Sequence, residues 1–315
     1  MVAIWILSFW KNLGSPKNFN LIELGAGNGE MMKILIESFK NFPNFFNSCN
    51  IYIHEKSPLL IKIQKKNLKG NRIIWLTDIN KIKKNPTIFI ANEFFDSIAI
   101  KQFIKIENSW FERYVKMKNK TRAFFFDKKF NMKTFEKKIK FQISYKQNFI
   151  EYSELGVKYL EIISKIIKKN NGGILIIDYG YFDEKMKNTL QAISNQKYSN
   201  VLNNVGSSDI THNINFNLFK RIVKKIGGLK ELTATQRNFL INIGIKERAE
   251  NASPLGGTLK FIVDGNAVFI NGNGEQNNVS MEDLEADCTI SVSTEVLEKL
   301  RDGELNPMMA VMGGQ

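Results

Sequence analysis

The sequence has little cysteine, histidine or arginine, and these shortages exclude several classes of protein. Its two cysteines, Cys49 and Cys288, are far apart in a chain of 315 residues, so neither a disulfide framework nor a cysteine-rich metal site is indicated. The two histidines, His54 and His212, are too few and too isolated for a metal centre, and we assign them structural roles. A reducing compartment fits this composition.

Long hydrophobic runs are also missing. The opening run MVAIWILSFW is interrupted by Lys11, well short of the roughly 20 apolar residues that span a bilayer. It also lacks the basic segment that begins a signal peptide. We therefore predict a buried helix here and no membrane span.

The net charge of +14 is unevenly distributed. Residues 1–250 carry 42 basic and 21 acidic groups, whereas residues 251–315 carry three basic and ten acidic groups. The reversal of sign indicates two segments of different origin or role. Only seven of the 45 basic residues are arginine, and the lysines are scattered among Asn, Ile and Phe, which is typical of an AT-rich genome. We interpret them as a solvated surface and expect no nucleic-acid partner.

Short β-rich runs alternate with helical periods in residues 1–250, which predicts a doubly wound α/β fold with a mainly parallel sheet. The region between Ile100 and Phe149 alternates apolar and charged residues and predicts antiparallel strands inserted into the sheet or beside it. The predicted strands are 19–24, 51–54, 72–76, 87–92 and 172–180, and the predicted helices are 30–40, 58–68, 153–168, 216–227 and 235–243.

The remainder predicts a small α+β segment. Residues 251–257 read as a linker, and 258–315 contain two strands joined around Asp264-Gly265, a further strand and a helix at 294–303. The predicted domains are therefore 1–250 and 258–315.

The sharpest motif is LIELGAGNGEMM, in which Glu23 ends a strand and Gly25, Gly27 and Gly29 follow at alternate positions. Glycines there allow a tight turn and let a ligand approach the backbone. A dinucleotide fingerprint needs glycine where Glu30 stands, so a pyrophosphate does not fit.

The charges around this turn favour a cationic ligand. Glu23 at its mouth suits a sulfonium and an ammonium group, and Glu55, after the second strand, could accept two hydrogen bonds from ribose hydroxyls. The cofactor that these features indicate is S-adenosylmethionine. A plain tight turn without a ligand is the structural alternative.

The fourth strand ends in ANEFFD, which places Asn92, Glu93 and Asp96 at the carboxyl edge of the sheet, where open α/β folds bind ligands. Two carboxylates there suit a guanidinium acceptor, which they could orient by bidentate hydrogen bonds. The alternative is that Glu93 and Asp96 cap the next helix.

A later strand brings Asp178 and Tyr179 to the same edge as candidate substrate residues. Asp209 is a third candidate, on a predicted loop before a helix, and could equally be an N-cap.

These motifs together resemble one family, the MidA-type methyltransferases, whose mitochondrial member is a complex I assembly factor. The matching stretches are ELGAGNGEMM, IFIANEFFDSIAIKQF, GGILIIDYGY, TLQA, GSSDITHNINFNLF and TQRNFLINIGIKERAE. Over about residues 1–250 the resemblance implies a class I methyltransferase fold and methylation of an arginine in a complex I subunit. By position it implies cofactor binding by Glu23, Gly25, Ala26, Gly27, Asn28, Gly29 and Glu55, and active-site roles for Asn92, Glu93 and Asp96.

Two departures from the family pattern concern its ends. The family normally begins with a segment of several tens of residues that is absent here, so Met1 resembles an internal methionine, and part of the wall of the substrate cleft is expected to be missing. In place of the family's C-terminal portion, residues 255–315 resemble a sterol-carrier-protein-2 domain, which buries lipid in an apolar tunnel. This copy stops early, and an open tunnel would expose Met308, Met309, Val311 and Met312.

The leading hypothesis is a protein methyltransferase that acts in the cytoplasm, or in the mitochondrial matrix if the chain is eukaryotic. Three alternatives remain open from the sequence: a non-catalytic assembly chaperone, a lipid carrier that acts through its C-terminal segment, and a chimeric fragment without activity.

Overall fold

The computed structural model describes residues 1–118, 122–195, 197–203, 206–236, 238–239, 244, 248–263, 265–280, 282–293 and 295–296. The chain divides into two compact units. The larger unit is Leu13–Glu231, and the smaller unit combines Met1–Asn12 with Leu232–Gln315.

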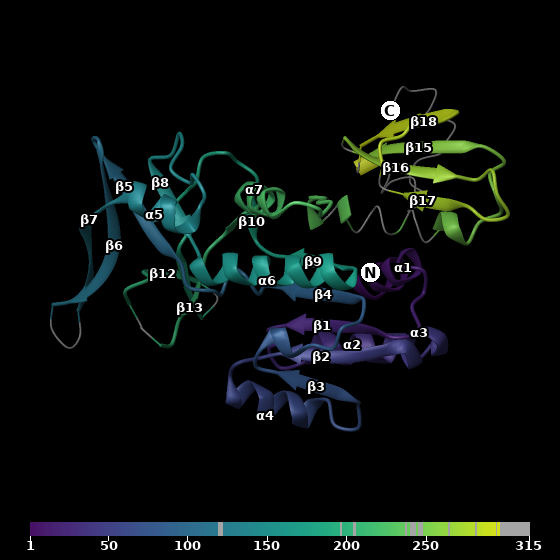
Figure 1. Cartoon of the computed structure of the whole chain (residues 1–315), viewed down its shortest axis with the longest axis horizontal. Coiled ribbons are helices and arrows are strands. Elements are labelled where there is room, and N and C mark those ends of the chain that lie inside the picture. The colour runs from purple at the N-terminus through teal and green to yellow at the C-terminus, as the bar shows by residue number, and fades with distance from the viewer. Residues whose placement is uncertain are drawn as a thin grey trace. The chain divides into compact units, whose positions relative to one another are not determined.

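The larger unit is organised around a five-stranded sheet in which every neighbouring pair of strands is parallel. Its strands are β1 (Phe19–Leu24), β2 (Cys49–His54), β3 (Ile73–Leu76), β4 (Thr87–Asn92) and β9 (Gly172–Ile177). The strand order is β3-β2-β1-β4-β9 (Figure 1). β2 and β3 therefore lie on one side of β1, and β4 and β9 lie on the other side, so the strand order reverses at β1. Open α/β folds bind their ligands outside the carboxyl ends of the strands at such a reversal.

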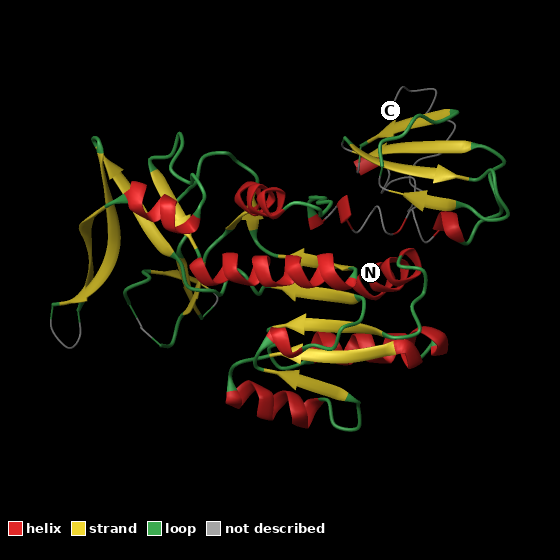
Figure 2. Ribbon diagram, in the orientation of Figure 1, coloured by secondary structure: helices red, strands yellow, loops and turns green. Residues whose placement is uncertain are grey.

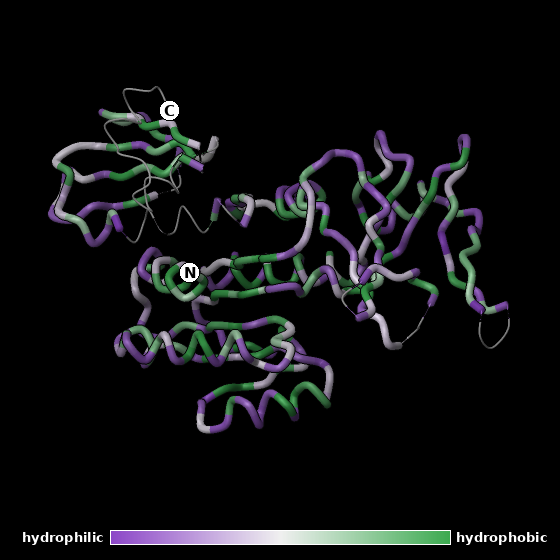
Figure 3. The backbone as a smooth tube through the Cα atoms, turned by 180° about the vertical axis from the view of Figure 1, so that it is seen from behind, coloured by the Kyte–Doolittle hydropathy of each residue, from purple (hydrophilic) through white to green (hydrophobic). Residues whose placement is uncertain are grey.

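Helices cover both faces of this sheet (Figure 2). On one face, apolar side chains of α6 and α7 pack on β1, β2 and β4. On the other face, α2 and Leu68 pack on β2. The hydropathy of the chain shows the same division, with hydrophobic strands between helices of mixed hydropathy (Figure 3). The helices of this part are α2 (Glu30–Phe39), α3 (Pro43–Ser48), α4 (Pro58–Asn67), η1 (Ile79–Lys81), α6 (Glu154–Asn170) and α7 (Phe216–Ile226).

Side-chain caps explain where α4, α6 and α7 begin. Ser57 accepts a hydrogen bond from the backbone of Leu60, and Pro58 occupies the first turn of α4. Ser153 and Asn215 cap α6 and α7 in the same way. The predicted parallel α/β fold is confirmed, and β1 and β4 have the predicted bounds.

The antiparallel strands predicted between residues 100 and 149 are confirmed and form a separate sheet beside the parallel one, in the order β7-β6-β5-β8. Its strands are β5 (Lys101–Ile106), β6 (Ser109–Met117), β7 (Ala123–Phe130) and β8 (Phe149–Tyr152). The sequence did not predict α5 (Met132–Ile139), which buries Met132 and Phe135 against this sheet.

The predicted loop before α7, which carries Asp209, is wrong in part, because β13 (Asp209–Thr211) and β14 (Ile214–Asn215) form there. Three further short strands precede it: β10 (Gly180–Tyr181), β11 (Gln191–Ser194) and β12 (Lys197–Ser199). β13 pairs with β11, and β14 pairs with β10. The buried side chain of Ile214 joins the core under α6, which explains why this segment is extended.

The smaller unit contains α1 (Val2–Asn12) and a four-stranded sheet in the order β17-β16-β15-β18. The predicted opening helix is confirmed, although Ile6 alone of its described residues is fully buried. The sheet strands are β15 (Thr258–Val263), β16 (Asn266–Asn271), β17 (Asn278–Ser280) and β18 (Cys288–Val292). The predicted hairpin around residue 265 is confirmed by the pairing of β15 with β16. Residues 297–315, which include most of the predicted last helix and the four apolar residues at 308–312, lie outside the described residues, as does most of the predicted helix 235–243.

The side chain of Asn277 forms hydrogen bonds with the predicted linker and the residues just before it. The amide nitrogen of Asn277 donates to the carbonyls of Ala249, Ala252 and Ser253, at 2.9, 3.2 and 3.0 Å. Its amide oxygen accepts from the backbone of Leu255. Asn277 is buried, so these hydrogen bonds replace the ones that water would supply.

Candidate active site

The turn between β1 and α2 lies at the point where the sheet reverses its order. Gly25, Gly27 and Gly29 all have left-handed backbones, with φ of 65°, 52° and 85°. A Cβ on Gly25 would lie 2.8 Å from the Phe94 ring, so this glycine is required by packing. A Cβ on Gly27 would meet nothing within 4 Å. The turn therefore keeps open space beside Gly27, as the approach of a ligand to the backbone requires. Ala26 and Asn28 lie between these glycines.

Glu23 is the most unusual group near this turn. It is 3% exposed, and its Oε2 has no hydrogen-bond partner in the described part of the chain. Burial raises the pKa of this carboxyl from 4.5 to about 7. A buried acceptor without a donor is costly, and a cationic donor from a ligand would remove that cost. The carboxylate therefore fits the ammonium group of S-adenosylmethionine.

Glu55 is held by its own neighbourhood. Its Oε1 accepts from the backbones of Lys56 and Ser57 at 2.8 and 2.9 Å. Its Oε2 accepts from Gln64 Nε2 at 3.2 Å. A carboxylate offers about four acceptor positions, so roughly one remains for a ribose hydroxyl, rather than the two that the sequence suggested.

Gln64 is a site residue that the sequence analysis missed. Its Nε2 also donates to the Gly27 carbonyl at 2.9 Å, and its Oε1 accepts from Trp75 Nε1 at 3.0 Å. Gln64 therefore joins Glu55 to the glycine turn. The available signal was a polar residue on the buried side of the helix LLIKIQKKNL, in which Gln64 is fully buried.

The loop after β4 carries the second group of candidates. Glu93 is exposed and has a left-handed backbone with φ of 46°, which is uncommon for a residue with a Cβ. No helix follows it, since residues 93–100 are turns and loop, so the alternative that Glu93 and Asp96 cap a helix is wrong. Asn92 is half-buried at the end of β4.

Asp96 resembles Glu23 in its burial. It is 5% exposed, and no described group donates a hydrogen bond to its Oδ1. Burial, with the negative charges of Glu93 and Asp209, raises the pKa of the Asp96 carboxyl above its ordinary range. Glu93 and Asp209 therefore both act electrostatically on Asp96.

Asp178 holds this loop against the end of β9. Its Oδ2 accepts from the backbones of Phe95 and Asp96 at 3.0 and 3.2 Å. Its Oδ1 accepts from the backbone of Tyr179. Burial and the charge of Asp96 raise the pKa of the Asp178 carboxyl to about 7, against the opposing effect of these hydrogen bonds. Asp178 therefore positions Asp96 and also shares its electrostatic environment.

Asp209 and Tyr179 have different surroundings. Asp209 is exposed in β13, near enough to Asp96 to raise its pKa, and it caps no helix, because Asn215 is the N-cap of α7. That alternative for Asp209 is wrong. Tyr179 is 62% exposed, and its carbonyl accepts from the backbone of Ile214.

The histidines have structural partners. His54 Nδ1 lies 2.9 Å from the Leu76 carbonyl, and its Nε2 lies 2.9 Å from the Tyr159 hydroxyl of α6. Burial lowers the pKa of His54, which keeps the ring neutral at pH 7. His212 Nε2 donates to the Ile98 carbonyl, and its backbone N–H donates to the Asp96 carbonyl. Both arrangements agree with the structural roles that we predicted.

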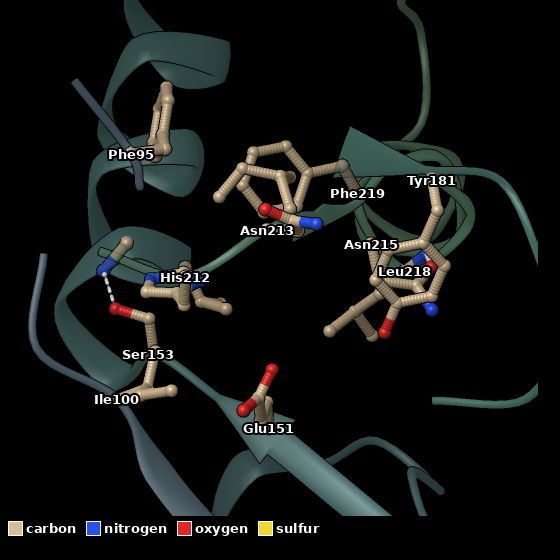
Figure 4. A pocket seen from close by; sticks show the side chains of 13 residues that line it. Phe95, Ile100, Glu151, Ser153, Tyr181, His212, Asn213, Asn215, Leu218 and Phe219 are labelled. Carbon is tan, nitrogen blue, oxygen red and sulfur yellow. Dashed lines mark hydrogen bonds between the residues drawn. The ribbon is translucent and has the colours of Figure 1, made fainter. Parts of the chain in front are cut away.

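A small cavity of about 30 Å³ lies beside this edge, between α6 and α7 (Figure 4). Phe95, Gly156, Leu218 and Phe219 line it together with Glu151. Glu151 accepts hydrogen bonds from three neighbouring residues, through the side-chain amide of Gln102 and the backbone N–H groups of Thr189 and Leu190. The volume is that of about one water molecule, so this cavity is too small for a nucleoside cofactor.

Among the described residues, no cluster of three or more His, Cys, Asp or Glu side chains is arranged to hold a metal ion. None of the helices they form has both the length and the apolar character needed to cross a membrane. Both cysteines are free thiols.

The five parallel strands in this order, with a glycine turn after β1 and acidic residues near the end of β1 and directly after β2 and β4, define the class I methyltransferase type of α/β fold. The model of an S-adenosyl-L-methionine-dependent methyltransferase family matches residues 1–235. The chain belongs to this family. A model of the SCP-2 sterol transfer family matches residues 241–315.

Curated relatives agree with this assignment. The chain is 29% identical over 276 residues to protein arginine methyltransferase NDUFAF7, mitochondrial, of Xenopus laevis, and 25% identical over 277 residues to the Homo sapiens protein of that name. Each alignment covers 79% of this chain, and 62% and 61% of the two relatives. The chain therefore spans less than two thirds of their length.

A crystal structure of a protein from Burkholderia thailandensis bound to S-adenosyl-homocysteine has a similar fold. The TM-score is 0.62 at 18% sequence identity, and the match covers 80% of this chain and 67% of that chain. This likeness concerns the fold.

Proposed function

We propose that the larger unit transfers a methyl group from S-adenosylmethionine to a guanidinium nitrogen of a protein arginine. The observation that carries this proposal is the cluster of carboxylates, centred on Asp96, beside a glycine turn with open space and an unpartnered Glu23. The relatives named as arginine methyltransferases support the same acceptor.

The first half of the site would hold the cofactor. When bound, S-adenosylmethionine supplies a methyl group on a positively charged sulfur. We assign Glu23 to its ammonium group and Glu55, oriented by Gln64, to a ribose hydroxyl. The bare backbone at residues 25–29 would allow close approach.

The second half would hold the acceptor. Glu93 is exposed at the carboxyl edge, where it can bind a guanidinium group in bidentate fashion and fix the attacking nitrogen in line with the methyl group. Asp96 Oδ1 is free to accept a hydrogen bond and then the proton that this nitrogen sheds, which its raised pKa favours. Asn92, Tyr179 and Asp209 would complete the wall around the acceptor.

Cofactor binding is tested by isothermal titration of the full chain with S-adenosylmethionine. We expect Gly27→Val to abolish binding, because the branched side chain would fill the open space. Gly70→Val is the matched control, since Gly70 also has a left-handed backbone with nothing within 4 Å but lies in the turn between α4 and β3. Equal binding by the Gly27 variant would refute the cofactor assignment.

Catalysis is tested with Glu93→Gln and a peptide that contains arginine. Methyl transfer should be lost while the affinity for S-adenosylmethionine stays nearly unchanged. Glu107→Gln is the control, because Glu107 is also exposed with a left-handed backbone, at φ of 52°, in the turn between β5 and β6. If Glu93→Gln still transfers the methyl group, the acceptor binds elsewhere. If the unaltered chain binds the cofactor but transfers no methyl group, a non-catalytic assembly chaperone is favoured.

Three further assignments are finer proposals. We infer a complex I subunit as the acceptor protein from the family resemblance, and a mitochondrial matrix location if the chain is eukaryotic from the relatives named mitochondrial. The match to the sterol transfer family supports lipid binding by the C-terminal segment, with a boundary near residue 250. Copurified lipid identified by mass spectrometry would test the last of these.

A further inference from the structure

The longest hairpin of the larger unit extends beyond the sheet to which it belongs. β6 pairs with β7 over residues 110–117 and 123–130, but β5 pairs with β6 only as far as Arg113. Residues 114–117 and 123–126 therefore form a two-stranded ribbon with no third strand, which we call the hairpin ribbon (Figure 1). Residues 119–121 lie outside the described residues.

Apolar side chains are exposed on both faces of the hairpin ribbon. Opposite strand positions place Tyr114, Phe124 and Phe126 on one face, and the Tyr114 and Phe126 rings stack at 5.6 Å. Val115 and Met117 lie on the other face and are 55% and 54% exposed. A protein partner that adds to one face would leave the other face in water, whereas a fluid apolar medium would cover both.

The charges of this hairpin are mainly positive, and its acidic residues are already paired. Asp127 forms a salt bridge with Arg113 at 3.1 Å, and Glu112 forms one with Lys101 at 3.0 Å. Four lysines in or next to β6 and β7 are exposed and have no ion-pair partner among the described residues. They are Lys116, Lys118, Lys128 and Lys129. The hairpin therefore presents positive charge to a partner that must be anionic.

We propose that the hairpin ribbon docks on an anionic lipid surface and inserts its apolar side chains at the boundary between head groups and acyl chains. Lysines beside an inserted apolar group can extend their ammonium groups back to lipid phosphates. Insertion would be shallow, because the unpaired edges of a two-stranded ribbon must stay hydrated. The match of residues 241–315 to a sterol transfer family adds independent support, since sterols reside in membranes.

The test measures binding of the full chain to phosphatidylcholine vesicles with and without phosphatidylglycerol, by flotation. We expect binding only to the anionic vesicles. Lys116→Gln combined with Lys118→Gln should weaken it about 25-fold, at about fivefold for each lysine. Lys62→Gln combined with Lys66→Gln, the same change of charge on exposed residues of α4, should leave binding nearly unchanged.

Insertion is distinguished from purely electrostatic docking by Val115→Ser combined with Met117→Ser. Both residues are exposed, so the variant should melt at the same temperature as the parent and still lose about tenfold or more in vesicle affinity. A polarity-sensitive dye at Met117→Cys, in a Cys288→Ser background, should shift to the blue with anionic vesicles, and the dye at Lys62→Cys should not.

Four outcomes would overturn the proposal. They are equal binding to neutral vesicles, no loss in the lysine variant, no loss in the Val115 and Met117 variant, and binding to soluble polyglutamate as tight as to vesicles. The last two together would assign the hairpin ribbon to an acidic protein. A dimer that the apolar substitutions dissociate, with vesicle binding unchanged, would assign it to a second copy of this chain.

Discussion

Replacing Glu23 by glutamine should change how the stability of the larger unit depends on pH. The pKa of this buried carboxyl is about 7 in the folded chain and about 4.5 when exposed. The folded state therefore holds a proton that the unfolded state releases between these values, so the free energy of unfolding falls as pH rises from 4.5 to 7. A pKa shift of one unit corresponds to 1.36 kcal/mol, so the free energy of unfolding should fall by about 3 kcal/mol across this pH range.

The assay is urea denaturation of the parent chain and of Glu23→Gln at several values between pH 4 and 8. The parent should lose about 3 kcal/mol more than the variant across this range, and any fixed cost of the new amide cancels in the comparison. The titration of Asp178 contributes to the pH dependence of both proteins, so its contribution also cancels in the comparison. Parallel pH profiles would refute the reasoning, because they would mean that Glu23 is solvated or has a partner.

The same substitution should also show whether Glu23 contributes to cofactor binding. Saturating S-adenosylmethionine should stabilise the parent chain at pH 8, because the ligand gives Glu23 a cationic partner. At the same ligand concentration the variant should gain less, because its affinity for the ligand is lower. An equal gain in both proteins would place the ammonium group of the cofactor elsewhere.

Four further predictions follow from single side chains. Gln64→Leu keeps the volume but releases Glu55, so affinity for S-adenosylmethionine in titration should fall about tenfold or more, as for a lost charge-assisted hydrogen bond. Asp96→Asn should flatten the pH profile of methyl transfer, which in the parent should rise as Asp96 ionises above its ordinary range. Ile163→Ala in α6 should cost about 2–5 kcal/mol in urea denaturation, since Ile163 is 1% exposed. Asn277→Ala should destabilise the smaller unit by about 1–3 kcal/mol and make residues 249–255 sensitive to proteolysis, without changing cofactor affinity.

Much of the parallel sheet could be predicted because its strands are short, apolar and bounded by turn residues. FNLIEL and TIFIAN are buried almost throughout, and strands buried on both faces give largely apolar runs that a sequence shows directly. The glycine turn was also visible, since its three glycines all have left-handed backbones that other residues seldom adopt.

The missed features depend on contacts between distant segments. Helix α5 lies among strands and was hidden, because Phe135 packs on Phe103 and Tyr152 from other parts of the chain. The role of Asp178 in holding the loop after β4 joins residues more than 80 positions apart. No local pattern shows which carboxylates will be buried together, so the electrostatics of the site needed the structure.

The pairing of β4 with β9 joins strands that are far apart in the sequence. Strands β1 to β4 lie within residues 19–92, whereas β9 begins at residue 172, after the intervening antiparallel sheet, and pairs Gly172 with Thr87. Closing such a long loop is an entropic cost that grows slowly, by about 0.6 kcal/mol for each doubling of length. The antiparallel excursion can therefore lengthen or shorten in the course of evolution with little entropic penalty to the pairing of β4 with β9.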